Sequence, residues 1–153
     1  FSILIANGVN LDLLGTREPS IYGNKTLADL ESLLIKESKQ LSRYFSIPNI
    51  ELDFFQSNNE SEYLEKISEP YDAAILNPGA WPHTSLALGD RLAGLKLSFI
   101  EVHLSNLASR DAIRQRSFCQ AHAQGVIFGL GLDTYTTGLY ALLKKTRPRF
   151  SPR

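Results

Sequence analysis

The chain has 153 residues, a length typical of one domain, and a globule of this size buries about 70% of the surface that its unfolded chain exposes. Lys plus Arg and Asp plus Glu both number 16, so the formal net charge of zero supplies no field that would favour nucleic acid or an anionic membrane. The single cysteine, Cys119, excludes a disulfide within the chain, and neither a long apolar helix nor a repeated Cys/His spacing typical of zinc sites occurs. We therefore expect one domain from a reducing, cytoplasmic setting, with no nucleic-acid or membrane partner.

Short runs rich in apolar or β-branched residues alternate with longer stretches of helical periodicity. The first long stretch opens with Thr26 and Asp29, a pair with the spacing of a capping box. In chain order, the predicted elements are a strand at 2–6, a helix at 26–44, a strand at 50–56, a helix at 61–68, a strand at 73–76, a helix at 85–93, a strand at 97–102, a helix at 110–116, a strand at 126–130 and a helix at 135–145.

This regular alternation of strand and helix predicts an α/β fold with a parallel sheet, helices on both faces and right-handed crossovers. We expect a flavodoxin-like three-layer sandwich with a five-stranded parallel sheet of order 2-1-3-4-5. Residues 1–146 would form its single domain, and the basic residues 147–153 a C-terminal tail.

Polar residues follow the first four predicted strands at the point where each strand ends. Ligand crevices of open parallel sheets lie beyond the carboxyl ends of the strands, so four polar turns at one edge indicate a binding site. Asn, Gly, Pro and Ser are also ordinary turn formers, which is the alternative interpretation of any one turn. The four segments are Asn7-Gly8-Val9-Asn10, Gln56-Ser57-Asn58-Asn59, Asn77-Pro78-Gly79 and His103-Leu104-Ser105-Asn106.

Two histidines near this edge are candidates for acid-base chemistry. Glu101 and His103 are two residues apart in a predicted strand, so both side chains lie on one face and the carboxylate can hold or charge the imidazole. The alternative is a packed histidine beside a surface glutamate. His83 lies just before or within the first turn of the helix after the third strand, where it is either a functional group or a solvent-facing cap residue.

The connection from Asn7 to Gly23 is long for a strand-to-helix loop, and long loops in compact domains are often lids or binding loops. It carries Arg17 and Tyr22. Ionising an unperturbed tyrosine at neutral pH costs about 4 kcal/mol, which is similar to the attraction of a cation about 4 Å away at an effective dielectric constant of about 20. The spacing leaves two interpretations open: Arg17 favours a tyrosinate at Tyr22, or Tyr22 packs under the loop and Arg17 is solvated.

Taken together, several blocks of the sequence resemble the type II 3-dehydroquinate dehydratases, and the resemblance spans nearly the whole chain. Several blocks in one order are far more specific than any single motif. The blocks are Asn7-Gly8-x-Asn10-Leu11-x-x-Leu14-Gly15-x-Arg17-Glu18-Pro19-x-x-Tyr22-Gly23, Phe55-Gln56-Ser57-Asn58, Asn77-Pro78-Gly79-Ala80, His83-Thr84-Ser85 and Glu101-Val102-His103-Leu104-Ser105-Asn106.

The resemblance implies anti elimination of water from 3-dehydroquinate to give 3-dehydroshikimate through an enolate, without metal, nucleotide or lysine Schiff base. Tyr22 would be the base that takes the proton beside the ketone, with its anion favoured by Arg17. Asn10 would hold the water that stabilises the enolate. His103 would protonate the departing hydroxyl, oriented by Glu101. The same step serves the shikimate pathway and quinate catabolism.

Further roles are implied for residues around these groups. The backbone amides of Leu104 and Ser105, together with Asn77, would hold the substrate carboxylate. His83 and Arg114 would bind ring hydroxyls.

The resemblance also implies a homo-oligomer, a dodecamer built from trimers, in which Asp90 reaches a neighbouring subunit's site. The sequence departs from the family's pattern at several positions, among them the following three. Val9 stands where proline is usual, Gly89 where an arginine usually precedes Asp90, and Trp81 where a smaller residue is usual beside His83. These departures bear on the loop entry, the subunit contacts and substrate affinity.

A flavodoxin-like binding module that holds a flavin or nucleotide without catalysis is the alternative from another class. A phosphate-binding loop needs clustered glycines or a Thr/Ser-rich turn directly after the first strand. The segment Asn7-Gly8-Val9-Asn10-Leu11 offers one glycine, which disfavours this alternative.

Overall fold

The structure is a computed structural model that describes residues 1–16, 20 and 23–146. Arg17, Tyr22 and the predicted tail therefore lie outside the described residues.

Five parallel strands form the centre of the molecule: β1 (Ser2–Asn7), β2 (Glu51–Gln56), β3 (Ala73–Asn77), β4 (Phe99–His103) and β5 (Gly125–Phe128). Their order across the sheet is β2-β1-β3-β4-β5, and every neighbouring pair is parallel. β3 and β4 are buried along their whole length, in agreement with their apolar sequences. The predicted flavodoxin-like sheet and its order are confirmed.

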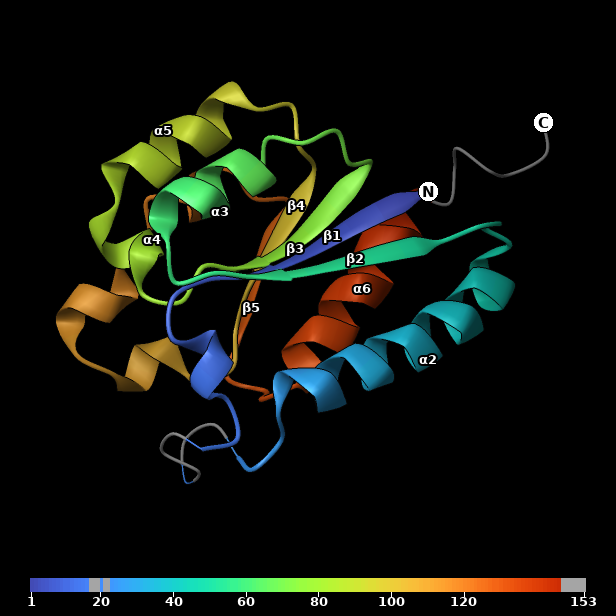
Figure 1. Cartoon of the computed structure of the whole chain (residues 1–153), viewed down its shortest axis with the longest axis horizontal. Coiled ribbons are helices and arrows are strands. Elements are labelled where there is room, and N and C mark those ends of the chain that lie inside the picture. Colours follow the sequence, from blue (N-terminus) through green and yellow to red (C-terminus); the bar gives the residue numbers. More distant parts are fainter. Residues whose placement is uncertain (17–19, 21–22, 147–153) are drawn as a thin grey trace.

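Helices cover both faces of the sheet (Figure 1). α2 (Leu27–Phe45) and α6 (Asp133–Thr146) lie on one face, whereas α3 (Glu60–Lys66), the short α4 (Trp81–Thr84) and α5 (Leu86–Gly94) lie on the other.

The alternation of side chains along β1 divides the core between these layers. Ile3 and Ile5 join the cluster that contains residues of α2 and α6, whereas Leu4 and Ala6 join the cluster that contains Tyr63 of α3 and residues of α5. Successive side chains of a strand point to opposite faces, so one run of apolar residues supplies both cores. The sandwich therefore follows directly from the apolar strand sequence.

Local side chains set where three of the helices begin. Thr26 and Asp29 form the predicted capping box at α2. The Asn59 side chain accepts from two backbone N–H groups at the start of α3, and the Ser85 hydroxyl accepts from Leu88 N at the start of α5. These helices consequently start within two residues of the predicted positions.

The predicted helix at 110–116 is wrong. The connection from β4 to β5 contains only 3-10 helices: η2 (Leu107–Ser109), η3 (Ala112–Gln115) and η4 (Gln120–His122). No residue of η3 is buried, and Ile113, its large apolar side chain, is 57% exposed. An α-helix in a protein depends mostly on burying an apolar face, and this segment has none to bury.

β5 ends at Phe128, two residues earlier than predicted. Gly129 follows with φ of 91°, and its N–H donates to the His103 carbonyl oxygen. This turn ties the end of β5 to the end of β4, beside the polar rim.

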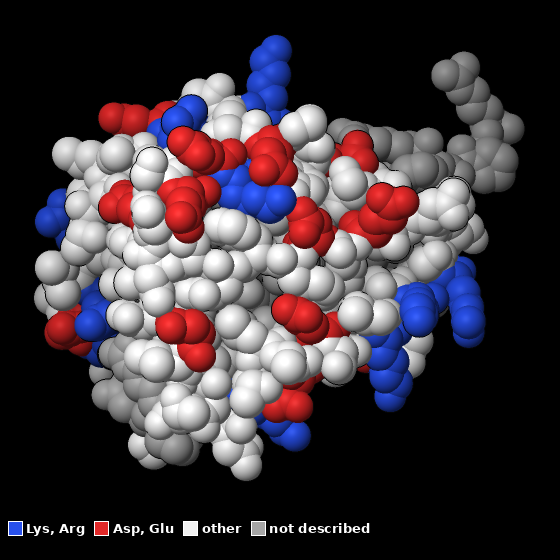
Figure 2. Space-filling model, in the orientation of Figure 1, with Lys and Arg blue, Asp and Glu red and all other residues white. Residues whose placement is uncertain are grey.

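Acidic and basic side chains both occur on the face shown in Figure 2. Among the described residues, no helix is both long enough and apolar enough to cross a bilayer.

Candidate active site

A pocket lies at the carboxyl ends of the strands, where the sequence predicted a binding site. Asn10 lines it from the connection after β1, Asn77 from the end of β3, and His103 from the end of β4. His83 of α4 and Arg114 of η3 complete its polar lining. The structure thus gathers side chains from five separate segments around one hollow.

His103 and Glu101 form a buried pair at this pocket. His103 Nε2 lies 2.7 Å from Glu101 Oε1, and the two residues are 5% and 0% exposed. The interpretation of Glu101 as a surface glutamate is therefore wrong, since β4 carries it into the interior. A carboxylate that accepts from one imidazole nitrogen leaves the other nitrogen, Nδ1, to exchange a proton with a molecule in the pocket.

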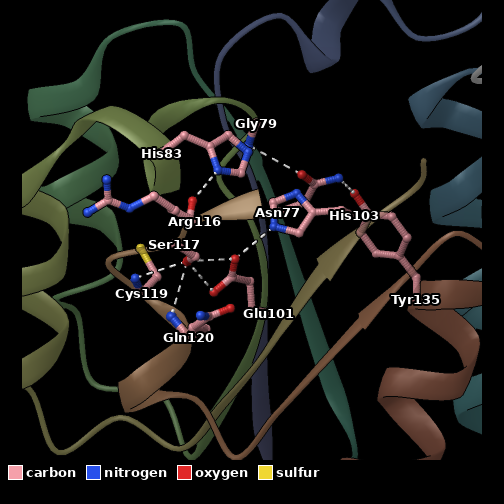
Figure 3. A network of polar contacts seen from close by, with 10 residues as sticks. All are labelled: Asn77, Gly79, His83, Glu101, His103, Arg116, Ser117, Cys119, Gln120 and Tyr135. Atoms are coloured by element: carbon pink, nitrogen blue, oxygen red, sulfur yellow. Dashed lines mark hydrogen bonds and ion pairs between the residues drawn. The ribbon is translucent and has the colours of Figure 1, made fainter. Parts of the chain in front are cut away.

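Ser117 holds the far side of Glu101 (Figure 3). Its hydroxyl lies 3.1 Å from Oε1 and 3.2 Å from Oε2 of Glu101. The same oxygen accepts from the backbone N–H groups of Cys119, at 3.1 Å, and Gln120, at 3.2 Å. The buried carboxylate thus has partners on two sides.

His83 is buried, so its interpretation as a solvent-facing cap residue is wrong. Its Nδ1 lies 2.6 Å from the backbone oxygen of Arg116, and this nitrogen must donate because a carbonyl oxygen only accepts. Burial lowers the pKa of His83 below its ordinary value, against the opposing effect of the Arg116 hydrogen bond. The neutral ring then offers Nε2 as an acceptor for a hydroxyl group.

The rings of His83 and His103 are stacked, with centroids 5.9 Å apart and planes 26° apart. A positive charge on His103 would lower the pKa of His83 further, because the two rings are neighbours.

Asn77 is held by a buried network that reaches across the sheet (Figure 3). Its Nδ2 donates to the Tyr135 hydroxyl at 2.8 Å, and its Oδ1 accepts from Gly79 N at 3.2 Å. The Tyr135 hydroxyl in turn donates to Asn7 Oδ1 at 2.5 Å. These contacts fix the orientation of the amide at the floor of the pocket.

Asn10 has φ of 66°, in the left-handed region that asparagine tolerates better than most residues. Its backbone N–H donates to Asn58 Oδ1 at 2.8 Å, and Asn58 Nδ2 donates to Asp12 at 3.2 Å. Gln56 Nε2 also reaches Asn58 Oδ1, at 3.2 Å. The turn after β2 therefore fixes the backbone that carries Asn10.

Arginine side chains lie on the side of the pocket formed by the β4–β5 connection. Arg114 Nε lies 3.0 Å from Asp111 Oδ1, and Arg110 lines the pocket with its Nη1 at 3.3 Å from the Ser105 hydroxyl. Leu104 and Ser105, whose backbone amides the resemblance implies as carboxylate ligands, also line the pocket. Cationic groups and strand-end amides are suited to an anionic ligand.

Asp90 is exposed on α5 and does not line this pocket within the chain. Among residues 1–16, 20 and 23–146, no group of three or more His, Cys, Asp or Glu side chains has an arrangement that could hold a metal ion.

Two residues that support the site carry no signal in the sequence. Ser117 lies 16 residues from Glu101, and Tyr135 lies 58 residues from Asn77. Neither belongs to a recognisable local motif. Contacts between residues this far apart in the sequence depend on how distant segments pack together, which residue spacing alone does not reveal.

Comparisons with known proteins agree with this geometry. A family model described as "Dehydroquinase class II" matches residues 1–143. A 3-dehydroquinate dehydratase from Prochlorococcus marinus is 44% identical over 145 residues, which cover 93% of this chain and 94% of the relative. One from Psychromonas ingrahamii is 44% identical over 148 residues, with 95% of each chain covered.

The fold agrees as well. The crystal structure of type II dehydroquinase from Propionibacterium acnes superimposes with a TM-score of 0.84 at 37% identity, and covers 94% of this chain and 96% of that one. A noncatalytic flavin or nucleotide module is not favoured by these relatives.

Proposed function

Because the chain belongs to the class II dehydroquinase family, we propose that it removes water from 3-dehydroquinate by anti elimination, giving 3-dehydroshikimate through an enolate. The observation that supports this most directly is the buried Glu101–His103 pair at the pocket, with Nε2 and Oε1 2.7 Å apart. Loss of a hydroxyl as water requires a proton donor, and this pair supplies one.

His103 acts as the general acid. With Glu101 accepting at Nε2, the protonated imidazole gives its Nδ1 proton to the departing hydroxyl, which leaves as water. Glu101 stabilises the imidazolium before the transfer and keeps the ring oriented. The burial of both groups strengthens this interaction, because few water molecules screen it.

Tyr22 acts as the base that takes a proton from the carbon beside the ketone, and Arg17 favours its anion. The negative charge then moves to the ketone oxygen of the enolate, which a water held by Asn10 stabilises. The proposal for Asn10 is supported by its position in the pocket lining and by its backbone bond to Asn58.

The remaining polar groups orient the substrate. Asn77 and the backbone amides of Leu104 and Ser105 bind the carboxylate, while His83 accepts from a ring hydroxyl through Nε2 and Arg114 contacts another. All five line the same pocket, which supports these assignments.

The protein assembles as a homo-oligomer, a dodecamer built from trimers, and works in the cytoplasm. In that assembly Asp90, which is exposed here, reaches the site of a neighbouring subunit. Mass measurement in solution tests the oligomer independently of activity.

The test of the reaction is to add 3-dehydroquinate to purified protein, with a chelator present, and to follow the conjugated enone of the product by ultraviolet absorbance. We expect turnover that the chelator does not reduce. Absence of turnover in folded protein would refute the proposal.

Single substitutions test the roles. Tyr22→Phe removes the base and His103→Ala removes the acid, so each is expected to lower kcat by roughly 10²–10⁴-fold. Turnover near that of the parent in either variant would contradict the role of that residue. Borohydride added with substrate should trap no adduct, because the route contains no imine; a covalent adduct would indicate a lysine mechanism instead.

A further inference from the structure

Ser117 contacts both oxygens of Glu101 from the connection between β4 and β5 (Figure 3). We propose that Ser117 is a positioning residue for the reaction, which fixes the hydrogen-bond direction at Glu101 and thereby selects the nitrogen of His103 that delivers the proton. This inference deepens the proposed function and rests on it for its kinetic part.

The direction follows from the capacity of a hydroxyl group. A serine hydroxyl has one hydrogen and two lone pairs. Both lone pairs are engaged, because the oxygen accepts from Cys119 N at 3.1 Å and Gln120 N at 3.2 Å. The single hydrogen therefore goes to Glu101, where it is shared between oxygens at 3.1 and 3.2 Å.

The consequence passes through Glu101 to His103. Ser117 donates to the carboxylate and so holds its position and orientation, with Oε1 toward His103. A carboxylate only accepts, so the hydrogen on the 2.7 Å contact belongs to His103 Nε2. Neutral His103 is then the Nε2–H tautomer, and its second proton enters and leaves at Nδ1. Ser117 thus influences the tautomer of His103, a ring that it does not contact.

Arg116, the residue before Ser117, fixes the tautomer of His83. The Arg116 backbone oxygen, 2.6 Å from His83 Nδ1, requires the Nδ1–H tautomer there. Two consecutive residues therefore hold the stacked imidazoles in opposite tautomers, with Nδ1 of His103 and Nε2 of His83 as the exchangeable nitrogens.

This segment is firmly held in the fold. Phe118 N donates to the Pro82 carbonyl at 2.8 Å, which ties the segment to α4. On α5, a Cβ at Gly89 would lie 2.8 Å from the Phe118 oxygen and 3.0 Å from its Cβ. The glycine at position 89 therefore lets the segment approach α5 at a distance that a side chain would not permit without a shift.

Ser117 is separate from the substrate pocket. Neither Ser117 nor Glu101 is among the described residues that line the pocket beside His103. Both line a different hollow, together with Gln120. Its effect on the reaction therefore operates through Glu101 and not through contact with substrate.

The first test uses the parent protein and needs no turnover. Nitrogen-15 NMR of histidine-labelled protein, assigned with His83→Gln and His122→Gln, reports the tautomer of each ring. We expect Nε2–H at neutral His103 and Nδ1–H at His83. An Nδ1–H tautomer at His103 in the parent overturns the proposal whether or not the enzyme turns over 3-dehydroquinate.

The second test is kinetic. Ser117→Ala should lower kcat about tenfold or more, a part of the 10²–10⁴-fold that a general acid supplies, while KM changes by less than about twofold. It should also mix the tautomers of His103. Ser117→Thr keeps the hydroxyl and should retain kcat within about threefold of the parent.

Ser85→Ala is the matched control, since the Ser85 hydroxyl also donates to a glutamate, Glu60, and accepts from a backbone N–H, that of Leu88 at 2.9 Å. It should lower the unfolding temperature while kcat stays near the parent value. If Ser117→Ala has parental kcat and an unchanged His103 spectrum, the proposal is refuted. If parent protein is inactive but shows the expected tautomers, the proposed function fails, whereas the tautomer assignment at His103 stands.

Discussion

Tyr135→Phe removes one oxygen atom from the interior beside the pocket. That oxygen bridges two asparagine side chains: it donates to Asn7 Oδ1 at 2.5 Å and accepts from Asn77 Nδ2 at 2.8 Å. Tyr135 is 0% exposed, and the two asparagines are 4% and 2% exposed. Burial raises the pKa of Tyr135 above its ordinary value, so the hydroxyl keeps its hydrogen throughout the working pH range.

The variant leaves two buried polar groups without their partner, Asn7 Oδ1 and one N–H of Asn77. Each costs about 1–3 kcal/mol when it is left unsatisfied, so we expect the free energy of unfolding to fall by about 3 kcal/mol. KM for 3-dehydroquinate should rise as well, because the Asn77 amide, which we propose binds the carboxylate, loses one of its two supports.

Urea unfolding followed by circular dichroism measures the change, with Tyr140→Phe as the control. Tyr140 is 39% exposed, and substitutions at such positions usually change stability by less than about 0.5 kcal/mol. Asn7 and Asn77 are partners in the register of β1 and β3, so the two amides are near enough to pair directly. If the free energy of unfolding falls by less than about 1 kcal/mol, the two amides pair directly. That result would refute the view that the Tyr135 hydroxyl is needed as their hydrogen-bond partner.

Burial raises the pKa of the Cys119 thiol to about 12, so this thiol should react with a disulfide reagent at pH 8 only when the chain unfolds; rapid labelling of folded protein would contradict its burial. Because burial lowers the pKa of His83, the unfolded chain binds more protons than the folded chain just below about pH 6.5, so the free energy of unfolding should decrease as the pH is lowered through this range. His83→Gln should reduce this pH dependence in urea titrations at several pH values. Gly89→Ala should lower the free energy of unfolding by roughly 1–3 kcal/mol, because its Cβ would meet the Phe118 oxygen at 2.8 Å; equal thermal melts for variant and parent would show that the segment yields freely. Gly94→Ala, whose Cβ would meet nothing within 4 Å, should instead leave stability unchanged or raise it by up to about 1 kcal/mol.

The sequence by itself determined the sheet. Its five apolar runs, separated by helical stretches, predict parallel strands, because buried strands need continuous apolar sequence and parallel strands need long crossovers. Caps such as Thr26 and Asn59 mark helix starts within a few residues of sequence, so local hydrogen bonding determined those boundaries. The pairing of Glu101 with His103 was also accessible, since it depends only on the two-residue period of a strand.

The conformation of the β4–β5 connection was decided by tertiary structure. Its helical composition predicted an α-helix, but the segment follows the rim of the pocket with no apolar face to bury, and only 3-10 turns form. The hydrogen bonds of this segment go to partners far away in the sequence. Phe118 N donates to the Pro82 oxygen, the Arg116 oxygen accepts from His83, and the Ser117 hydroxyl donates to Glu101.

Those long-range contacts explain why part of the site was visible in the sequence and part was not. The groups expected to meet substrate stand at strand ends, where parallel strands must converge, so topology alone brings Asn10, Asn77 and His103 together. The groups that orient them, Ser117 and Tyr135, come from segments whose approach is set by packing, at close contacts such as that between Gly89 and Phe118. Such contacts depend on the shapes of several elements at once, which no local pattern in the sequence records.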